Sequence, residues 1–177
     1  MDPIVLGFTG RIGSGKTTIS SVVAEKLDWP RVSFGDYVRK IAQERGLEES
    51  REVLQQLGES LLSGNPEQFC RAVLAHAHWK QGQSLVIDGV RHIEVVDWLR
   101  HLVAPAKFLL VYVAVSESAR QSRLLERDRT DASLLPSIES HSTERDVTSV
   151  LLSQADLIID SSQSPEQITK RIMESIM

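Results

Sequence analysis

Residues 10–17 read Gly-Arg-Ile-Gly-Ser-Gly-Lys-Thr. This octapeptide fits the pattern G-x-x-x-x-G-K-[ST], in which a glycine-rich turn wraps around a phosphate group. An apolar run at residues 4–9 precedes it, and residues 16–27 follow with apolar side chains at helical spacing. A buried strand, a phosphate-binding loop and a helix are therefore predicted in this order, and this unit decides the class of fold.

The composition of the loop explains its expected chemistry. Glycines allow successive N–H groups to point at one anion, and the helix that follows adds its positive amino end. Lys16 is expected to reach the β and γ phosphates of ATP, and the Thr17 hydroxyl to bind Mg²⁺. The residues predicted to bind the nucleotide are Gly10, Arg11, Ile12, Gly13, Ser14, Gly15, Lys16, Thr17 and Thr18.

Strand and helix patterns alternate through the rest of the chain. Further strands are predicted at residues 31–34, 85–88, 108–115 and 157–159. Helices are predicted at residues 36–46, 50–62, 65–80, 94–102, 116–128, 143–153 and from 164 onward. Alternation of this kind implies parallel strands joined by right-handed crossovers. The predicted fold is an α/β/α sandwich with about five parallel strands in the order 2-3-1-4-5 and its ligands at the carboxyl ends of the strands.

The overall composition is that of an ordinary globular chain. Of 177 residues, 41% are hydrophobic and 25% are charged, and the formal net charge is −4. We expect one domain over residues 1–177, with a lid insert at 129–142. Nucleic-acid-binding domains are more often basic, so no nucleic-acid partner is expected. No apolar run reaches the roughly 18 residues of a membrane span, and the amino terminus lacks the basic region of a signal peptide, so a cytoplasmic location is expected.

Cysteine and histidine carry little information in this chain. Cys70 is the one cysteine, which rules out an intramolecular disulfide, and its apolar neighbours predict a small buried side chain. The five histidines show no spacing typical of metal ligands, so no zinc site is predicted.

An acidic residue closes the third predicted strand. Residues 85–88 read Leu-Val-Ile-Asp, an apolar run that ends in Asp88. Downstream of a phosphate-binding loop, such an aspartate holds Mg²⁺ directly or through water. The predicted metal residues are therefore Thr17 and Asp88. The alternative interpretation of Asp88 is a cap on the next helix.

Candidate residues for the phosphate acceptor follow the second and third strands. Asp36 and Arg39 are three residues apart and share one face of a helix that begins near the expected γ-phosphate. Asp36 is suited to orient an acceptor hydroxyl or a Mg²⁺-bound water, and Arg39 to bind an acceptor phosphate in bidentate fashion. Arg91 comes just after the third strand and is a second phosphate-binding candidate. The alternative interpretation is a surface ion pair for Asp36 and Arg39, and a surface arginine for Arg91.

The helix after the fourth strand is rich in arginine. Arg123 and Arg127 lie one turn apart, and two guanidinium groups suit the charge that develops on a transferring phosphoryl group. We predict catalytic roles for Lys16, Asp36, Arg123 and Arg127. The same helix also carries Arg120, Arg129 follows it, and Arg145 lies beyond the expected lid. A solvated charged face is the alternative interpretation of these arginines.

These motifs together resemble those of nucleoside monophosphate kinases and their relatives. Gly35-Asp36-x-x-Arg39 is similar to the adenylate kinase segment that binds the monophosphate, and Arg123-x-x-x-Arg127 to that family's lid arginines. The loop with its strand is close to the dephospho-CoA kinase version, and Asp88-Gly89-Val90-Arg91 resembles relatives of that kinase. Two positions depart from these families, because Arg91 is only three residues after Asp88 and Phe34 replaces a second aspartate.

Three functions follow from these observations. The first is an ATP-dependent kinase that transfers the γ-phosphoryl group to a nucleoside or deoxynucleoside monophosphate. The second is a dephospho-CoA-type kinase, in which Asp36 is a general base for a ribose hydroxyl. The third is a P-loop ATPase that acts as a regulatory switch without an acceptor. ATP and Mg²⁺ are the expected cofactors, and a small phosphorylated molecule is the expected partner.

Overall fold

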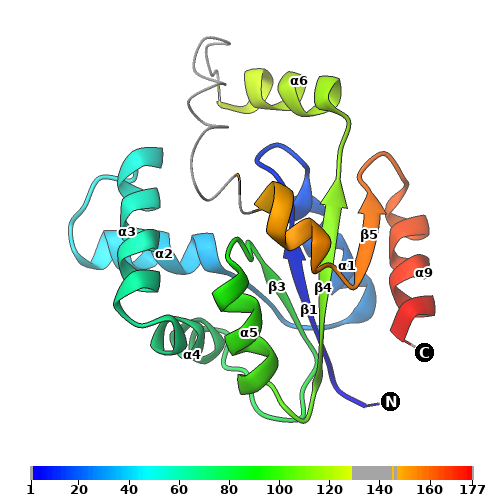
Figure 1. Cartoon of the computed structure of the whole chain (residues 1–177), viewed down its shortest axis with the longest axis horizontal. Coiled ribbons are helices and arrows are strands. Elements are labelled where there is room, and N and C mark those ends of the chain that lie inside the picture. The colour runs from blue at the N-terminus through cyan, green and yellow to red at the C-terminus, as the bar shows by residue number, and fades with distance from the viewer. Residues whose placement is uncertain (1, 129–144, 146, 177) are drawn as a thin grey trace.

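A computed structural model describes residues 2–128, 145 and 147–176, the side chains of residues 127 and 128 excepted. Strands and helices alternate along this part of the chain (Figure 1). The elements are β1 (Ile4–Thr9), α1 (Lys16–Leu27), β2 (Arg31–Ser33), α2 (Phe34–Glu44), α3 (Arg51–Gly64), α4 (Pro66–His76), β3 (Leu85–Asp88), α5 (Ile93–Leu102), β4 (Lys107–Ala114), α6 (Glu117–Asp128), the π-helix η2 (Val147–Leu151), β5 (Leu157–Asp160) and α9 (Pro165–Ile176).

The five strands form one parallel sheet in the order β2-β3-β1-β4-β5. This order confirms the fold predicted from the sequence. Phe8 of β1 pairs with Asp88 of β3, and Asp88 also pairs with Ser33 of β2. Because parallel strands end at the same edge, the loops after β1, β2 and β3 lie together.

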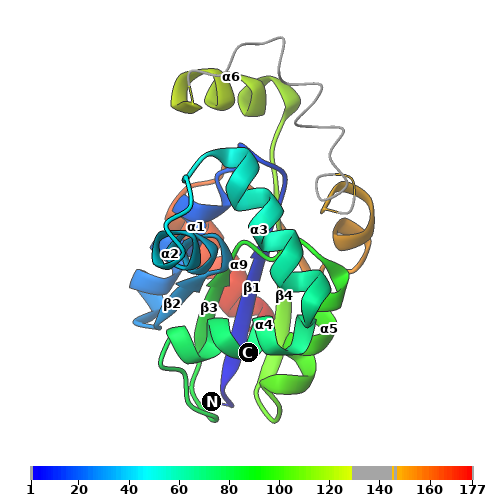
Figure 2. The ribbon, with the colours of Figure 1, turned by 90° about the vertical axis from the view of Figure 1, so that its left-hand side faces the viewer.

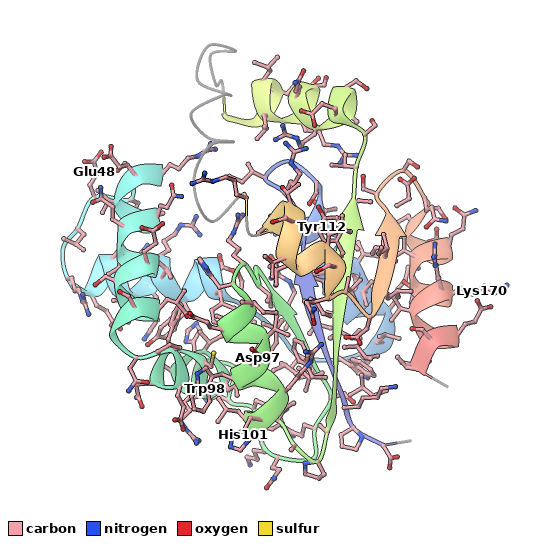
Figure 3. The ribbon with its side chains drawn as sticks, in the orientation of Figure 1. Glu48, Asp97, Trp98, His101, Tyr112 and Lys170 are labelled. Carbon is pink, nitrogen blue, oxygen red and sulfur yellow. The ribbon has the colours of Figure 1, made fainter. Side chains whose placement is uncertain are left out.

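Helices cover both faces of the sheet, and each face has its own apolar core. Alternate residues of a strand point to opposite faces, so β1 contributes to both cores. Leu6 and Phe8 pack with Val23 of α1 and Ile168 of α9 on one face. The other face packs against α2, α3, α4, α5 and η2, and Tyr112 of β4 lies within it (Figure 3). The result is the expected three-layer sandwich.

Local side-chain chemistry explains where the element boundaries differ from those predicted. Phe34 was expected at the end of the second strand, but it begins α2 because the Ser33 hydroxyl accepts from the Asp36 N–H at 3.3 Å and caps the helix. The helix predicted at 65–80 ends at His76, and His78 has φ 52°, which a continuing helix does not tolerate. Within the segment predicted as helix 143–153, residues 147–151 form a π-helix.

Helix α6 stands apart from the two helical layers. Figures 1 and 2 show it lying across the carboxyl ends of the strands, directly above the loop between β1 and α1. The predicted lid at 129–142 lies outside the described residues. None of the helices that the structure describes combines the length and the apolar character needed to span a bilayer.

Candidate nucleotide-binding site

The loop between β1 and α1 has the backbone shape of an anion cradle. Gly10, Gly13 and Gly15 have φ values of 155°, 81° and 87°. At Gly13 an added Cβ would also lie 3.1 Å from the backbone oxygen of Arg120, so only glycine fits. Inside the turn, the Ser14 N–H donates to the Arg11 carbonyl at 3.0 Å. The loop therefore holds its shape through its own backbone.

The first turn of α1 suits a phosphate group. Gly15 occupies the N-cap without a side-chain cap bond, and the first turn contains no acidic residue. The positive end of the helix dipole is therefore not compensated locally. Lys16 is the first residue of this helix and is only 8% exposed. Thr17 and Thr18 follow it with exposed side chains.

Arginines of helix α6 donate hydrogen bonds to successive carbonyl oxygens on the side of the loop that faces this helix. Arg120, fully buried, donates to the Ile12 oxygen at 3.4 Å. Arg123 donates to the Gly13 oxygen at 3.4 Å and to the Ser14 oxygen at 3.0 Å. Because C=O and N–H point in opposite directions across a trans peptide, the N–H groups that follow these carbonyls face away from α6. The helix thus fixes the direction in which the loop amides point.

The β5–α9 turn also reaches this contact. Its Ser161 hydroxyl accepts from Arg123 at 3.3 Å, so one guanidinium group joins α6, the loop and the turn. A cavity of about 340 Å³ lies beside the loop. Its lining residues are Gly13, Gly15, Thr18, Arg123, Leu124 and Glu126. This volume lies next to the proposed phosphate site, where the rest of a nucleotide would extend.

Glu117, the first residue of α6, links Arg11 of the loop to Arg120 of the same helix. Its carboxylate accepts from Arg120 at 2.6 Å and from Arg11 at 2.8 Å. The hydrogen bond from Arg120 lowers the pKa of Glu117 to about 2, and the charges of Arg120 and Arg11 add to this effect. A carboxyl group with a lowered pKa in the folded state stabilises that state above its unfolded pKa, and the stabilisation disappears as the pH falls through the folded value.

Acid should therefore loosen this contact in a definite range of pH. Between pH 4.5, the ordinary value, and about 2, the wild-type protein is expected to lose stability that a Glu117→Gln variant does not have. Thermal unfolding measured from pH 6 to pH 2.5 tests this, with Glu174→Gln on α9 as the control. Equal acid dependence in Glu117→Gln and wild type would contradict the assignment.

The two predicted metal residues lie at the same edge of the sheet. Asp88 is 2% exposed, and Arg31 donates to its Oδ2 at 2.7 Å. Among the described residues, nothing forms a hydrogen bond with the buried Asp88 Oδ1. A buried carboxylate oxygen without a partner is costly unless a ligand binds there. A divalent cation, or a water bound to it, fits this oxygen together with the Thr17 hydroxyl.

The acceptor-side candidates follow β2 and β3. Arg39 donates to Asp36 at 3.1 Å and also contacts Glu49 at 3.4 Å, and all three side chains are between 41% and 60% exposed. An added Cβ at Gly89 would lie 3.8 Å from the Gly35 nitrogen, so the β3–α5 turn lies against the start of α2. Arg91 is half-buried in that turn. Asp36 and Arg39 thus form an ion pair near the start of α2, and Arg91 lies in the turn that contacts that start.

The structure describes only some of the arginines predicted on α6 and after it. Arg123 lies on the loop, whereas the side chain of Arg127 and all of Arg129 fall outside the described residues. Arg145 is exposed, and its carbonyl oxygen accepts from Ser149. Sequence reasoning did not single out Arg31 or Glu117. The i, i+3 spacing of Glu117 and Arg120 was a usable signal, whereas the partner of Arg31 is 57 residues away.

The strand order, the glycine-rich loop and the arginine-bearing helix α6 that contacts it define a P-loop nucleotide-binding protein with a kinase-like fold. The model of the AAA domain family matches residues 6–147. A UPF0200 protein of Pyrobaculum aerophilum is 31% identical over 175 residues, which span 95% of this chain and 94% of that protein. The chain belongs to the UPF0200 proteins, within the AAA domain family.

Solved structures share the fold at low identity. APS kinase CysC of Mycobacterium tuberculosis, in complex with AMPPNP and APS, has a TM-score of 0.65 and 17% identity, and the match covers 99% of this chain and 98% of that one. Shikimate kinase of Aquifex aeolicus has a TM-score of 0.61 and 17% identity, with 98% and 96% covered. At this identity the likeness extends to the fold, which is that of P-loop kinases.

Proposed function

We propose that this chain is an ATP-dependent small-molecule kinase that transfers the γ-phosphoryl group of ATP to a nucleoside or deoxynucleoside monophosphate. One observation supports it above the others. The carbonyl oxygens of Ile12, Gly13 and Ser14 in the loop accept from α6, and the uncapped amino end of α1 and the buried Lys16 follow the loop directly. This arrangement favours a chain of phosphate groups over a neutral ligand.

Each residue of the site has a role in that reaction. Lys16 neutralises the β and γ phosphates, and Thr17 with Asp88 would hold Mg²⁺, which supplies a Lewis acid for the phosphate oxygens when bound. Arg123, already on the loop, is positioned beside the nucleotide cavity, and Arg127 is proposed to add a second positive charge. Phosphoryl transfer depends on positioning and on charge neutralisation, so no covalent intermediate on the protein is required.

Asp36, Arg39 and Arg91 are proposed to hold the acceptor. Arg39 and Arg91 would bind its phosphate, while Asp36 orients the attacking oxygen. A second acceptor class also has structural support, because Asp36 and Glu49 already compensate the charge of Arg39. An acceptor hydroxyl without a nearby phosphate, as in a dephospho-CoA-type kinase, would leave these pairs in place, with Asp36 as the general base.

A product assay with the Asp36→Asn variant separates these acceptors. The protein is incubated with ATP and Mg²⁺ and with nucleoside monophosphates, deoxynucleoside monophosphates, dephospho-CoA or shikimate-type alcohols, and the products are identified by mass. For a monophosphate acceptor, Asp36→Asn should slow transfer only about tenfold, since a carboxylate that orients is less essential than one that removes a proton. For a hydroxyl acceptor, the loss should be about a hundredfold to ten-thousandfold.

The chain offers a matched control for this experiment. Asp97, labelled in Figure 3, forms an i, i+3 pair with Arg100 on α5, as Asp36 does with Arg39 on α2. Asp97→Asn should leave transfer unchanged. Slow ATP hydrolysis with no phosphorylated product from any acceptor would contradict the kinase proposal and would support a regulatory ATPase.

A further inference from the structure

A hydrogen-bonded chain connects the two proposed metal residues beneath the phosphate site. Arg31 opens β2, and its Nη2 donates to Asp88 Oδ2 at 2.7 Å while its Nε donates to the Ser20 hydroxyl at 3.1 Å. Ser20 in turn donates to the Thr17 carbonyl at 3.0 Å. These hydrogen bonds therefore link α1 to the end of β3 through the single guanidinium group of Arg31.

The side chains in this arrangement are largely buried. Ser20 is fully buried, the Asp88 side chain is 3% exposed and the Arg31 side chain is 21% exposed. A cation nearby stabilises a carboxylate that is removed from water at this depth. Arg31 is that cation, and its planar fork of donors fixes the carboxylate through one oxygen. The second oxygen, Oδ1, remains without a hydrogen-bond partner among the described residues.

The hydroxyl of Ser20 sets the direction of the guanidinium group. A hydroxyl has one hydrogen to donate and lone pairs to accept, and Ser20 uses the hydrogen for Thr17 and a lone pair for Arg31. The guanidinium plane is therefore fixed at Nε by α1 and at Nη2 by β3. A change in the first turns of α1 would move Asp88 through these bonds.

We infer that Arg31 is a positioning residue for the divalent cation: it holds the buried Asp88 by Oδ2, so that Oδ1 is presented to the metal or its water, in register with Thr17. This inference rests on the proposed nucleotide site. The competing role is purely structural, in which Arg31 only attaches β2 and α1 to β3. The two roles differ in whether the effect of a substitution depends on the cation.

The structure predicts a graded series of variants. Arg31→Gln removes the charge that balances Asp88, whereas Arg31→Lys keeps the charge but has no planar fork to bind Ser20 and Asp88 together. Ser20→Ala leaves the charge in place and removes the acceptor at Nε, together with the hydrogen bond from Ser20 to the Thr17 carbonyl. Arg100→Gln is the control, because Arg100 also pairs with carboxylates away from the site, Asp97 on its own helix α5 and Asp156 just before β5.

The test measures nucleotide affinity by calorimetry, once with Mg²⁺ and once with EDTA, and takes the ratio of the two dissociation constants. Arg31→Gln should reduce the gain from Mg²⁺ about tenfold to a hundredfold, as loss of a residue that orients a metal ligand does, and should leave the affinity in EDTA within about twofold. Arg31→Lys and Ser20→Ala should give smaller losses, and Arg100→Gln none.

Each outcome decides the question. If Arg31→Gln weakens binding equally with and without Mg²⁺, or retains the full gain from Mg²⁺, Arg31 does not position a metal ligand and the inference is wrong, although the kinase proposal stands. If the wild-type protein binds no nucleotide under either condition, the proposed function itself fails. Should Arg31→Gln not fold, Ser20→Ala carries the same comparison, because it removes no charge.

Discussion

Lys16→Ala is expected to lower the rate of phosphoryl transfer about a hundredfold to a thousandfold or more, because the variant loses the ammonium group that follows the loop directly. Lys16 is the first residue of α1 and is 8% exposed, so its charge acts where water screens it weakly. Single-turnover measurements with saturating ATP and acceptor separate this loss of rate from a loss of binding.

Helix α1 also provides the control for this variant. Lys26, in the last turn of the same helix, forms an exposed ion pair with Glu166 at 3.1 Å. Surface pairs of this kind contribute little to stability, so Lys26→Ala should transfer phosphate at the wild-type rate. If Lys16→Ala and Lys26→Ala were equally active, the assignment of the phosphate site would be wrong.

Gly10→Ala should cause the largest loss of stability among glycine substitutions in the loop. An added Cβ would lie 2.8 Å from the Val113 carbonyl oxygen in β4 and 2.7 Å from the Ser14 hydroxyl. Val113 lies in β4, which pairs with both β1 and β5, and is itself paired with Ile159 of β5, so it cannot move aside without disturbing the sheet. We expect a loss of about 2–4 kcal/mol in the free energy of unfolding, and weaker nucleotide binding because the loop shifts.

Substitutions at two other glycines distinguish the stability lost to a steric clash from the stability lost to backbone strain. Gly46 has φ 65° with no atom within 4 Å of an added Cβ, and Gly64 has neither a positive φ nor a neighbour at that distance. Gly46→Ala should therefore lose only the cost of the left-handed conformation, about 1–2 kcal/mol, and Gly64→Ala should lose nothing. Urea unfolding gives all three values. A Gly10→Ala variant as stable as Gly64→Ala would contradict the predicted collision.

The sequence predicted the fold well because its strongest signals are local. The phosphate-binding loop needs eight consecutive residues, and each buried strand of a parallel sheet is a short apolar run, as Leu85–Asp88 illustrates. Boundaries were less accurate where one side chain decides them. The Ser33 hydroxyl caps α2, which begins two residues earlier than the sequence pattern suggested.

Only part of the candidate site's geometry follows from the sequence, for the same reason. Lys16 and Asp88 follow from position within a motif or a strand. The role of Arg123 as a donor to loop carbonyls does not, because it depends on how α6 is placed across the sheet edge. Arg31 and Asp88 meet only once β2 and β3 pair in register, which no spacing along the chain reveals.

The seating of α6 on the loop has an entropic consequence. An arginine side chain loses about 2 kcal/mol of rotamer freedom when it is immobilised. In this protein Arg123 is fixed by three acceptors, on Gly13, Ser14 and Ser161. That ordering cost is incurred during folding, so an incoming nucleotide meets a preorganised wall and retains more of its contact energy as affinity.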